Sequence, residues 1–306
     1  MAQLANAADE GFRSLYESGA EGGNLSASGG FEMVTHSTLE SAGPHDVAVE
    51  IGGMPIVLRT GDAEFRALLE KRYAGFVRRP GAASFALDVD VVRPDRQICE
   101  EEELEVWNDG GLWRLERGDF QAEWDPRVGQ GRLAQGVSPY AIDSVLRIVH
   151  SLIQAQAGGF LLHGASAIRN GKAFLFSGVS GAGKTTISSL IPKDGVLLTD
   201  EISYVRRDGE AYRACGTPFA GELARLGENA SAPIVRLFFL AKGPENRIEP
   251  IETPDALRML LRNILFFADD PELVKMVFRS ACEFLARVPA FRLTFFPDAR
   301  VWDLIQ

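Results

Sequence analysis

The feature that most constrains this chain is the string GVSGAGKT at residues 178–185, read together with its neighbours on both sides. The string matches the pattern G-x-x-x-x-G-K-[ST] without a departure. It follows an apolar run of strand composition, Ala173 to Phe176, and it precedes the helix-compatible run TTISSLI. A strand, a glycine-rich loop and a helix in this order make up a phosphate-binding P-loop, so the sequence predicts a nucleotide-binding α/β fold.

Each residue type in the loop has a use in phosphate binding. The glycines let backbone N–H groups turn toward phosphate oxygens, Lys184 brings a positive charge to the outer phosphates, and the Thr185 hydroxyl can bind Mg²⁺. We therefore predict ATP or another nucleotide and Mg²⁺ as cofactors, with Lys184 acting in catalysis as well as in binding. The predicted nucleotide-binding residues are Gly178, Val179, Ser180, Gly181, Ala182, Gly183, Lys184, Thr185 and Thr186.

The strand that leads into the loop has an unusual neighbour. Residues 161–168 and 172–176 are both strand-like, and Asn170-Gly171 between them is the strongest short signal for a β-hairpin. Common mononucleotide folds reach neighbouring strands through helical crossovers instead. The sequence therefore predicts an antiparallel hairpin and a P-loop that leaves a mixed sheet.

An acidic pair follows soon after the loop. The helix is stopped by Pro192, a short apolar strand runs from Val196 to Leu198, and Asp200 and Glu201 end it only 16 residues after Lys184. Beside a P-loop, one carboxylate can hold Mg²⁺ and another can accept the proton of an attacking hydroxyl. The alternative is a carboxylate pair in a loop that begins the next hairpin.

The residues before this region predict two further parts. Residues 1–45 are rich in Gly, Ser, Ala and Glu and predict a mobile leader. Residues 46–137 predict a small α+β domain with a hairpin at Gly52-Gly53, a helix capped by Asp62 that extends to Phe76, a strand at 85–92, and two strands within 112–124. We expect the glutamates between residues 100 and 105 to be a solvated segment and not a metal site.

Residues 138–306 are predicted to form the nucleotide-binding domain. A helix starts at Ser138-Pro139 and stops at Gly158, and His150 near its end is expected to be structural, in a place that suits a cation. Farther along, 234–240 reads as a buried strand, and apolar periodicity predicts helices that start near Pro254 and Pro271.

The composition disfavours some classes of binding partner. Lys and Arg total 32 and Asp and Glu total 42, which gives a formal charge of −10, so general binding to nucleic acid or to an anionic membrane surface is disfavoured. Three widely spaced cysteines (Cys99, Cys215 and Cys282), no secretory signal and no apolar run long enough for a membrane span lead us to expect a cytoplasmic protein.

Several motifs in this sequence resemble those of a known family. His163-Gly164, the strand-turn-strand, GVSGAGKTT and the acidic pair resemble the catalytic domain of HPr kinase/phosphorylase, whose core is related to that of ATP-dependent phosphoenolpyruvate carboxykinase. The run from about Val47 to Gln306, including GTPF at 216–219 and PD..VW at 297–302, is more closely similar to HPr-kinase-related proteins of peptide-modification cassettes, of the SynChlorMet or lasso-peptide type. The resemblance implies an α/β fold with a mixed-sheet P-loop kinase core of this type, preceded by the small α+β domain.

The resemblance also implies roles for single residues. His163 matches a histidine that would lie near the transferring phosphate, and Asp200 matches the first of two aspartates that serve as base and metal neighbour. Glu201 replaces the second aspartate, with the same charge on a longer side chain. A recognisable HPr-kinase signature loop is missing after the acidic pair, where Glu222 is the nearest acidic candidate, and this argues against HPr itself as the acceptor.

The leading hypothesis is thus a kinase that uses a Mg-nucleotide to phosphorylate a hydroxyl, in a Ser or Thr of a small protein or peptide. Its catalytic residues would be Asp200, His163 and Lys184, and its metal neighbours Thr185, Asp200 and Glu201. One alternative is a nucleotide-binding maturation or regulatory protein that transfers no phosphate itself. Another is a carboxykinase-like enzyme or a kinase of a small molecule such as a free amino acid. The acceptor, the preferred donor nucleotide, a phosphorylase reaction and the oligomeric state, homo-oligomers included, remain open.

Overall fold

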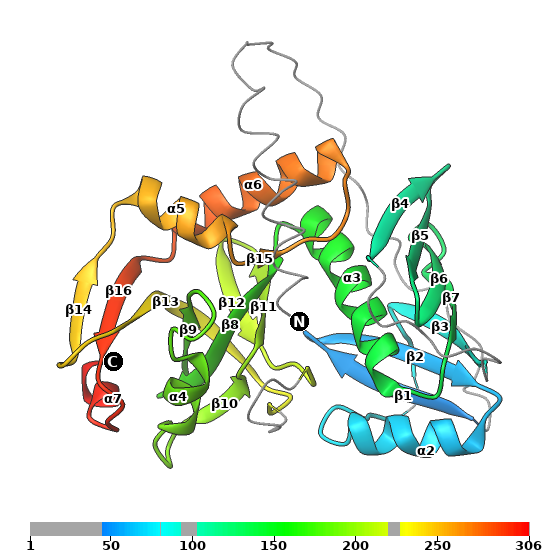
Figure 1. Cartoon of the computed structure of the whole chain (residues 1–306), viewed down its shortest axis with the longest axis horizontal. Coiled ribbons are helices and arrows are strands. Elements are labelled where there is room, and N and C mark those ends of the chain that lie inside the picture. Colours follow the sequence, from blue (N-terminus) through cyan, green and yellow to red (C-terminus); the bar gives the residue numbers. More distant parts are fainter. Residues whose placement is uncertain (1–44, 80, 93–102, 220–226, 306) are drawn as a thin grey trace, which may run out of the picture.

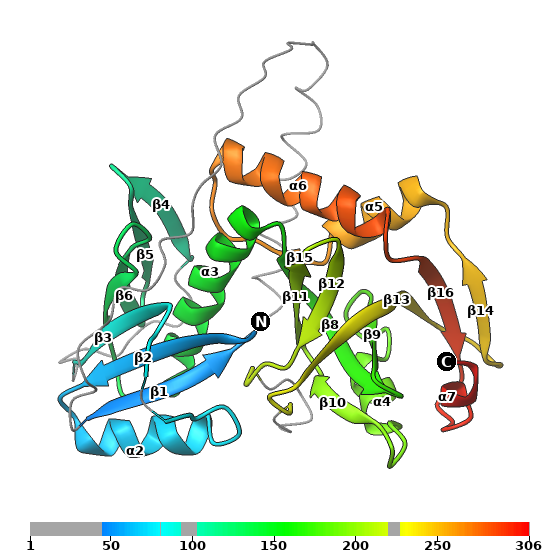
Figure 2. The ribbon, with the colours of Figure 1, turned by 180° about the vertical axis from the view of Figure 1, so that it is seen from behind.

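The computed structural model describes residues 45–79, 81–92, 103–219 and 227–305, which form two mixed β-sheets with helices packed against them (Figure 1 and Figure 2). The predicted leader lies outside the described residues except for its last one, and so do Cys99, the glutamates at 100–102 and Glu222. None of the helices in the described ranges is both long and apolar enough to cross a membrane.

The first sheet has seven strands in the order β1-β2-β3-β7-β6-β5-β4. Its pairs are antiparallel except for β2–β3 and β3–β7, which are parallel. Its elements are β1 (Asp46–Ile51), β2 (Met54–Thr60), α2 (Ala63–Arg72), β3 (Phe85–Val91), β4 (Glu105–Asp109), β5 (Leu112–Arg117), β6 (Phe120–Asp125) and β7 (Gln130–Gln135). Strands β4 and β7 were not predicted.

Local signals in this sheet account for most of its elements. The hairpin at Gly52-Gly53 is confirmed, with Ile51 opposite Met54. Asp62 caps α2 by accepting hydrogen bonds from the backbone N–H groups of Glu64 and Phe65. The predicted extension of this helix to Phe76 is wrong. The chain turns at Tyr73, and the Phe76 carbonyl instead accepts a hydrogen bond from Glu50 N at 2.9 Å.

Helix α3 (Pro139–Ala157) lies between the two sheets (Figure 1). Its predicted ends are confirmed, with Ser138 as N-cap, Pro139 in the first turn and Gly158 in a left-handed conformation at the C-cap. His150 is structural as predicted, but the idea that its place suits a cation is wrong. The side chain is fully buried, and burial lowers its pKa to about 3, so it is neutral at pH 7.

The second sheet has nine strands, seven of them in the order β10-β8-β11-β12-β13-β16-β14, while β9 pairs with β8 and β13, and β15 pairs with β8. Its strands are β8 (Phe160–Arg169), β9 (Lys172–Ser177), β10 (Val196–Thr199), β11 (Ile202–Asp208), β12 (Ala211–Cys215), β13 (Ser231–Lys242), β14 (Arg247–Pro250), β15 (Ile264–Leu265) and β16 (Ala290–Phe295). The helices that follow α3 are α4 (Lys184–Ser189), α5 (Thr253–Leu261), α6 (Pro271–Leu285) and α7 (Val301–Leu304).

The predicted hairpin before the loop is confirmed. β8 and β9 pair antiparallel from Gly164–Ser177 to Arg169–Lys172, and Asn170 and Gly171 both have positive φ, as a tight two-residue turn requires. β9 is parallel to its other neighbour, β13. The P-loop segment therefore leaves a mixed sheet, as predicted.

Two of the hydrophobic clusters in the described residues bear on the site. The larger one continues from the first sheet through α3 into the second sheet. The smaller one lies under the P-loop, where the Phe176 ring meets those of Phe238 and Trp302, and the Trp302 indole donates a hydrogen bond to the Ile187 carbonyl at 3.3 Å. The division of the chain into 1–45, 46–137 and 138–306 stays a prediction.

Candidate active site

The P-loop segment connects β9 to α4. Gly181 and Gly183 have φ angles of 75° and 111°, and α4 begins at Lys184. The Lys184 ammonium donates to the Gly178 carbonyl at 3.1 Å and lies 3.5 Å from that of Val179. The lysine thus folds back over its own loop, while Thr185 and Thr186 lie in the first turn of α4.

The loop also rests against the end of β16. A Cβ atom on Gly183 would lie 2.7 Å from the Phe295 ring. A side chain at this position would therefore force either the Phe295 ring or the loop to shift, in addition to the strain of the positive φ.

Strand β8 brings the loop and the acidic pair together. Gly164 pairs with Ser177, the last residue before the loop, on one side, and His163 pairs with Ile202 on the other side. The Gly164 N–H donates to the Glu201 carbonyl at 2.8 Å, and the Ser177 hydroxyl donates to the His163 carbonyl at 2.8 Å. Since adjacent strands lie about 4.8 Å apart, the loop and the acidic pair flank His163-Gly164 within two strand spacings.

Gly164 is required for this close approach. A Cβ atom there would lie 2.8 Å from the backbone oxygen of Phe176. Any other residue would push β8 away from β9 just where the P-loop begins.

The acidic pair is largely shielded from solvent. Asp200 is 3% exposed. The turn is fixed by the Thr199 hydroxyl, which accepts from the N–H groups of Glu201 at 3.3 Å and Ile202 at 3.2 Å. Burial raises the pKa of Glu201, the negative charge of Asp200 raises it further, and the positive charges of Arg147 and Lys184 oppose both.

His163 is held as a neutral ring. Burial, together with the positive charges of Lys184 and Arg147, lowers its pKa to about 4. Its backbone N–H donates to the Asn263 carbonyl at 2.7 Å. The positive charge of Lys184 lowers the pKa of both His163 and Glu201, so the three side chains lie close enough to interact electrostatically.

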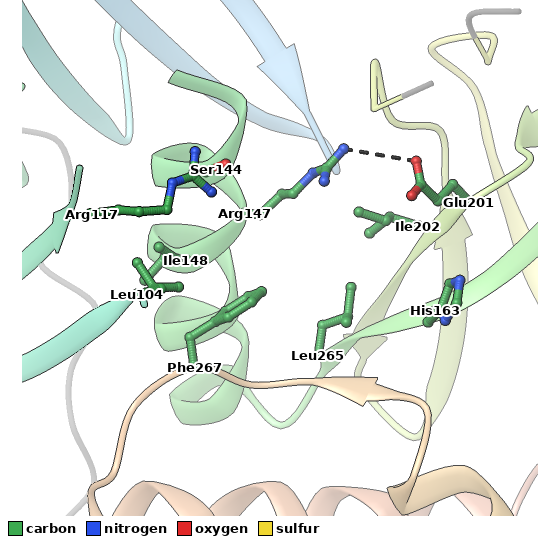
Figure 3. Close-up of a pocket in the computed structure, with 10 residues that line it drawn as sticks. All are labelled: Leu104, Arg117, Ser144, Arg147, Ile148, His163, Glu201, Ile202, Leu265 and Phe267. Carbon is green, nitrogen blue, oxygen red and sulfur yellow. Dashed lines mark ion pairs between the residues drawn. The ribbon is translucent and has the colours of Figure 1, made fainter. Parts of the chain in front are cut away.

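A pocket opens beside His163 and Glu201 (Figure 3). Its wall opposite β8 and β11 is α3, with Ser144, Arg147 and Ile148. Leu104, which precedes β4, and Arg117 of β5 reach it from the side of the first sheet, and Leu265 and Phe267 reach it from the segment after α5. The pocket is thus built from both sheets.

Arg147 is the functional candidate that the sequence did not reveal. Its Nη2 lies 3.9 Å from Glu201 Oε2, and its guanidinium lies over the Phe219 ring at 5.0 Å. It stands on α3, outside every motif, so only the packing of α3 against the second sheet brings it to the acidic pair. The one available signal was a pair of charged residues, Asp143 and Arg147, within the apolar pattern of that helix.

The oxygen donors fit a magnesium ion held partly by phosphate. Within the described ranges, no group of three or more His, Cys, Asp and Glu side chains could hold a metal by itself. A hydroxyl (Thr185) and carboxylates (Asp200 and Glu201) are nevertheless ligand types that Mg²⁺ prefers, and Mg²⁺ commonly takes substrate phosphates and waters as its other ligands.

Comparison with known proteins gives one family. The model of a family described as SynChlorMet cassette protein ScmC matches residues 135–306, more than half of the chain. No curated protein matches significantly. Among solved structures, the Hpr(Ser) kinase/phosphatase from Coxiella burnetii aligns with a TM-score of 0.27 and 13% sequence identity, over 47% of this chain and 85% of that one.

Proposed function

The chain belongs to the SynChlorMet cassette protein ScmC family, and we propose that it is a kinase that transfers phosphate from a Mg-nucleotide to a hydroxyl group in a small protein or peptide. The observation that carries this proposal is the strand register around β8. It sets a complete P-loop sequence on one side of His163-Gly164, and the buried Asp200 and the partly buried Glu201 on the other. A phosphate-binding loop and carboxylates that hold the metal or accept a proton recur in phosphoryl-transfer sites.

The nucleotide would bind over the loop. Backbone N–H groups of Gly178–Thr186 would hold the phosphates, and Lys184 would exchange its contacts with the loop carbonyls for contacts with phosphate oxygens. Thr185 and one carboxylate of the acidic pair would hold Mg²⁺, which offsets the negative charge of the phosphates when it is bound.

The acceptor would be activated by Asp200. Its carboxylate accepts the hydroxyl proton while the acceptor oxygen forms a bond to the γ-phosphorus, and the bond from that phosphorus to the bridging oxygen breaks, so that the nucleoside diphosphate leaves. His163, which is neutral at pH 7, would lie beside the transferring group as a hydrogen-bond partner. Glu201 would support the metal.

The test is phosphate transfer from labelled ATP in the presence of Mg²⁺, with the small proteins and peptides encoded beside this chain as acceptors. Lys184→Ala is the matched control, because the loss of its charge should weaken Mg-ATP binding at least about tenfold in calorimetry while the fold survives. Equal affinity of the parent and this variant would contradict the nucleotide site. Normal ATP binding without transfer to any acceptor would favour a regulatory nucleotide-binding protein.

A further inference from the structure

The pocket beside the acidic pair has two different sides. On one side Leu104, Ile148, Leu265 and Phe267 offer apolar surface, and on the other side stand Arg147, His163 and Glu201 (Figure 3). The pocket has a volume of about 60 Å³, which is room for a small apolar group or a few water molecules, and it continues into open solvent.

The polar side is incompletely satisfied. Arg147 Nε and Glu201 Oε2 are both buried, and within the described part of the chain neither atom has a hydrogen-bond partner. Their ion pair spans 3.9 Å, too long for a hydrogen bond. Buried polar atoms without partners are costly, so a ligand that supplies one donor and one acceptor to these two side chains would stabilise both.

The other arginine of the pocket is already engaged. Arg117 donates two hydrogen bonds to Asp119, at 2.5 and 2.7 Å, and its guanidinium lies over the Phe120 ring. The charge of this residue is therefore matched within the first sheet. Of the pocket's two arginines, Arg147 is the one that a ligand can engage.

We infer that this pocket binds the acceptor as a peptide segment, with a large apolar residue next to the phosphorylated Ser or Thr packed against Phe267 and Leu265. The peptide backbone carries one N–H and one C=O per residue, which matches Glu201 as acceptor and Arg147 as donor. The apolar side chain fills the inner part of the pocket, and the hydroxyl-bearing residue points toward Asp200. This inference rests on the proposed kinase function and adds the sequence preference of its acceptor.

The experiment uses the full chain, labelled Mg-ATP and a positional-scanning library of short synthetic Ser-centred peptides in which one flanking position at a time is fixed. We expect Leu, Ile, Met or Phe at one flanking position to raise kcat/KM at least about tenfold over Gly or Asp, as burial of a large apolar side chain predicts. Phe267→Ala should reduce this preference to less than about threefold, and Phe266→Ala is the matched control, because this half-buried neighbour does not line the pocket.

A second pocket variant keeps the inference testable if Phe267→Ala does not fold. Leu104→Ala removes apolar surface that the segment just before β4 contributes to the pocket, and it should also weaken the preference. Mg-ATP affinity measured by calorimetry must stay within about twofold of the parent in all three variants, because none of these side chains lies in the P-loop. Loss of ATP binding in the parent would overturn the kinase proposal and this inference together.

Other results would overturn the inference alone. One is normal ATP binding with no library peptide phosphorylated. Another is phosphorylation without an apolar preference, and a third is a preference that Phe267→Ala and Leu104→Ala leave unchanged.

Discussion

Single residues in the site differ in how their charge is controlled. His163 is kept neutral by burial and by two neighbouring cations, whereas burial raises the pKa of Glu201 against those same cations. The positive charge available to an incoming phosphate therefore comes from Lys184 and Arg147 and not from the imidazole. On this basis the roles of the two carboxylates can be separated by experiment.

Asp200→Asn should lower turnover by roughly 10² to 10⁴, because the amide keeps the shape and a hydrogen bond but cannot take up the hydroxyl proton. Nucleotide affinity should change far less. The measurement is kcat on the acceptor that the parent modifies, together with Mg-ATP calorimetry. Full phosphate transfer by this variant would place the base elsewhere, and His163 would be the next residue to test.

Glu201→Gln should instead raise the Mg²⁺ concentration needed for half-maximal rate, because an amide oxygen binds Mg²⁺ less tightly than a carboxylate does. Excess Mg²⁺ should restore part of the rate. A Mg²⁺ titration of initial rates measures this shift, with Asp200→Asn as comparison. An unchanged Mg²⁺ requirement would remove Glu201 from the metal site.

Among the elements, helix α3 contacts strands of both sheets. Asp143 accepts hydrogen bonds from Arg72 and, at 2.7 Å, from the Tyr73 hydroxyl, and so ties α3 to the end of α2. One turn later, Arg147 faces Glu201. The helix therefore holds the first sheet and the acidic pair in a fixed relation.

Replacing Asp143, which connects α3 with the end of α2, should lower the stability of the fold. Asp143→Ala leaves a largely buried guanidinium and a buried hydroxyl without their partner, and it should lower the free energy of unfolding by about 3 kcal/mol. Urea denaturation measures the loss. Glu70→Ala, which breaks the exposed Arg66–Glu70 pair, is the control and should cost less than about 0.5 kcal/mol. If the two substitutions lower the free energy of unfolding equally, the hydrogen bonds from Arg72 and Tyr73 to Asp143 do not stabilise the fold as proposed.

The elements that the sequence predicted are those with local signals. The turn at Asn170-Gly171, the cap at Ser138 and the loop at 178–185 each depend on a few adjacent residues, and their geometry follows from them. Strand β4 is exposed along most of its length, and β7 contains a glycine and polar residues, so neither carries a clear alternating pattern. The approach of Arg147 and Phe267 depends on packing between distant segments, which no local pattern encodes.

In the whole molecule, the two sheets meet at an aromatic contact around His150. Its ring packs edge-on against Phe85 of the first sheet, at 5.6 Å, and against Tyr204 of the second, at 5.4 Å. The Tyr204 hydroxyl accepts a hydrogen bond from Gln154 at 2.9 Å and lies 3.1 Å from His150 Nδ1. Because burial lowers the pKa of His150 to about 3, the histidine at this junction is neutral at pH 7.

Stability should consequently depend on pH through this residue. The folded pKa of His150 is about 3 and the unfolded value is about 6.5, so the unfolded state binds more protons between these values. The contribution to stability is complete above pH 6.5 and is lost as the pH falls toward 3, by up to about 1.4 kcal/mol per pH unit.

The measurement is urea denaturation at a series of pH values for the parent and for His150→Gln, which cannot take up a proton. The difference between the two free energies of unfolding should change with pH below 6.5 and stay constant above it. A difference that is constant across the whole range would contradict the neutral buried histidine.

The hairpin of β8 and β9 also bears on the order in which the site forms. Its two strands are joined by a two-residue turn, so the base of the P-loop is assembled with very little loop-closure entropy. The pocket, in contrast, needs Leu104, Arg147 and Phe267 to come together across long stretches of chain. Contacts that are near in sequence form early and those far apart form late. The part of the site that we propose to bind phosphate is accordingly expected to form early, and the pocket that we propose for the acceptor is expected to be completed only when the two sheets dock.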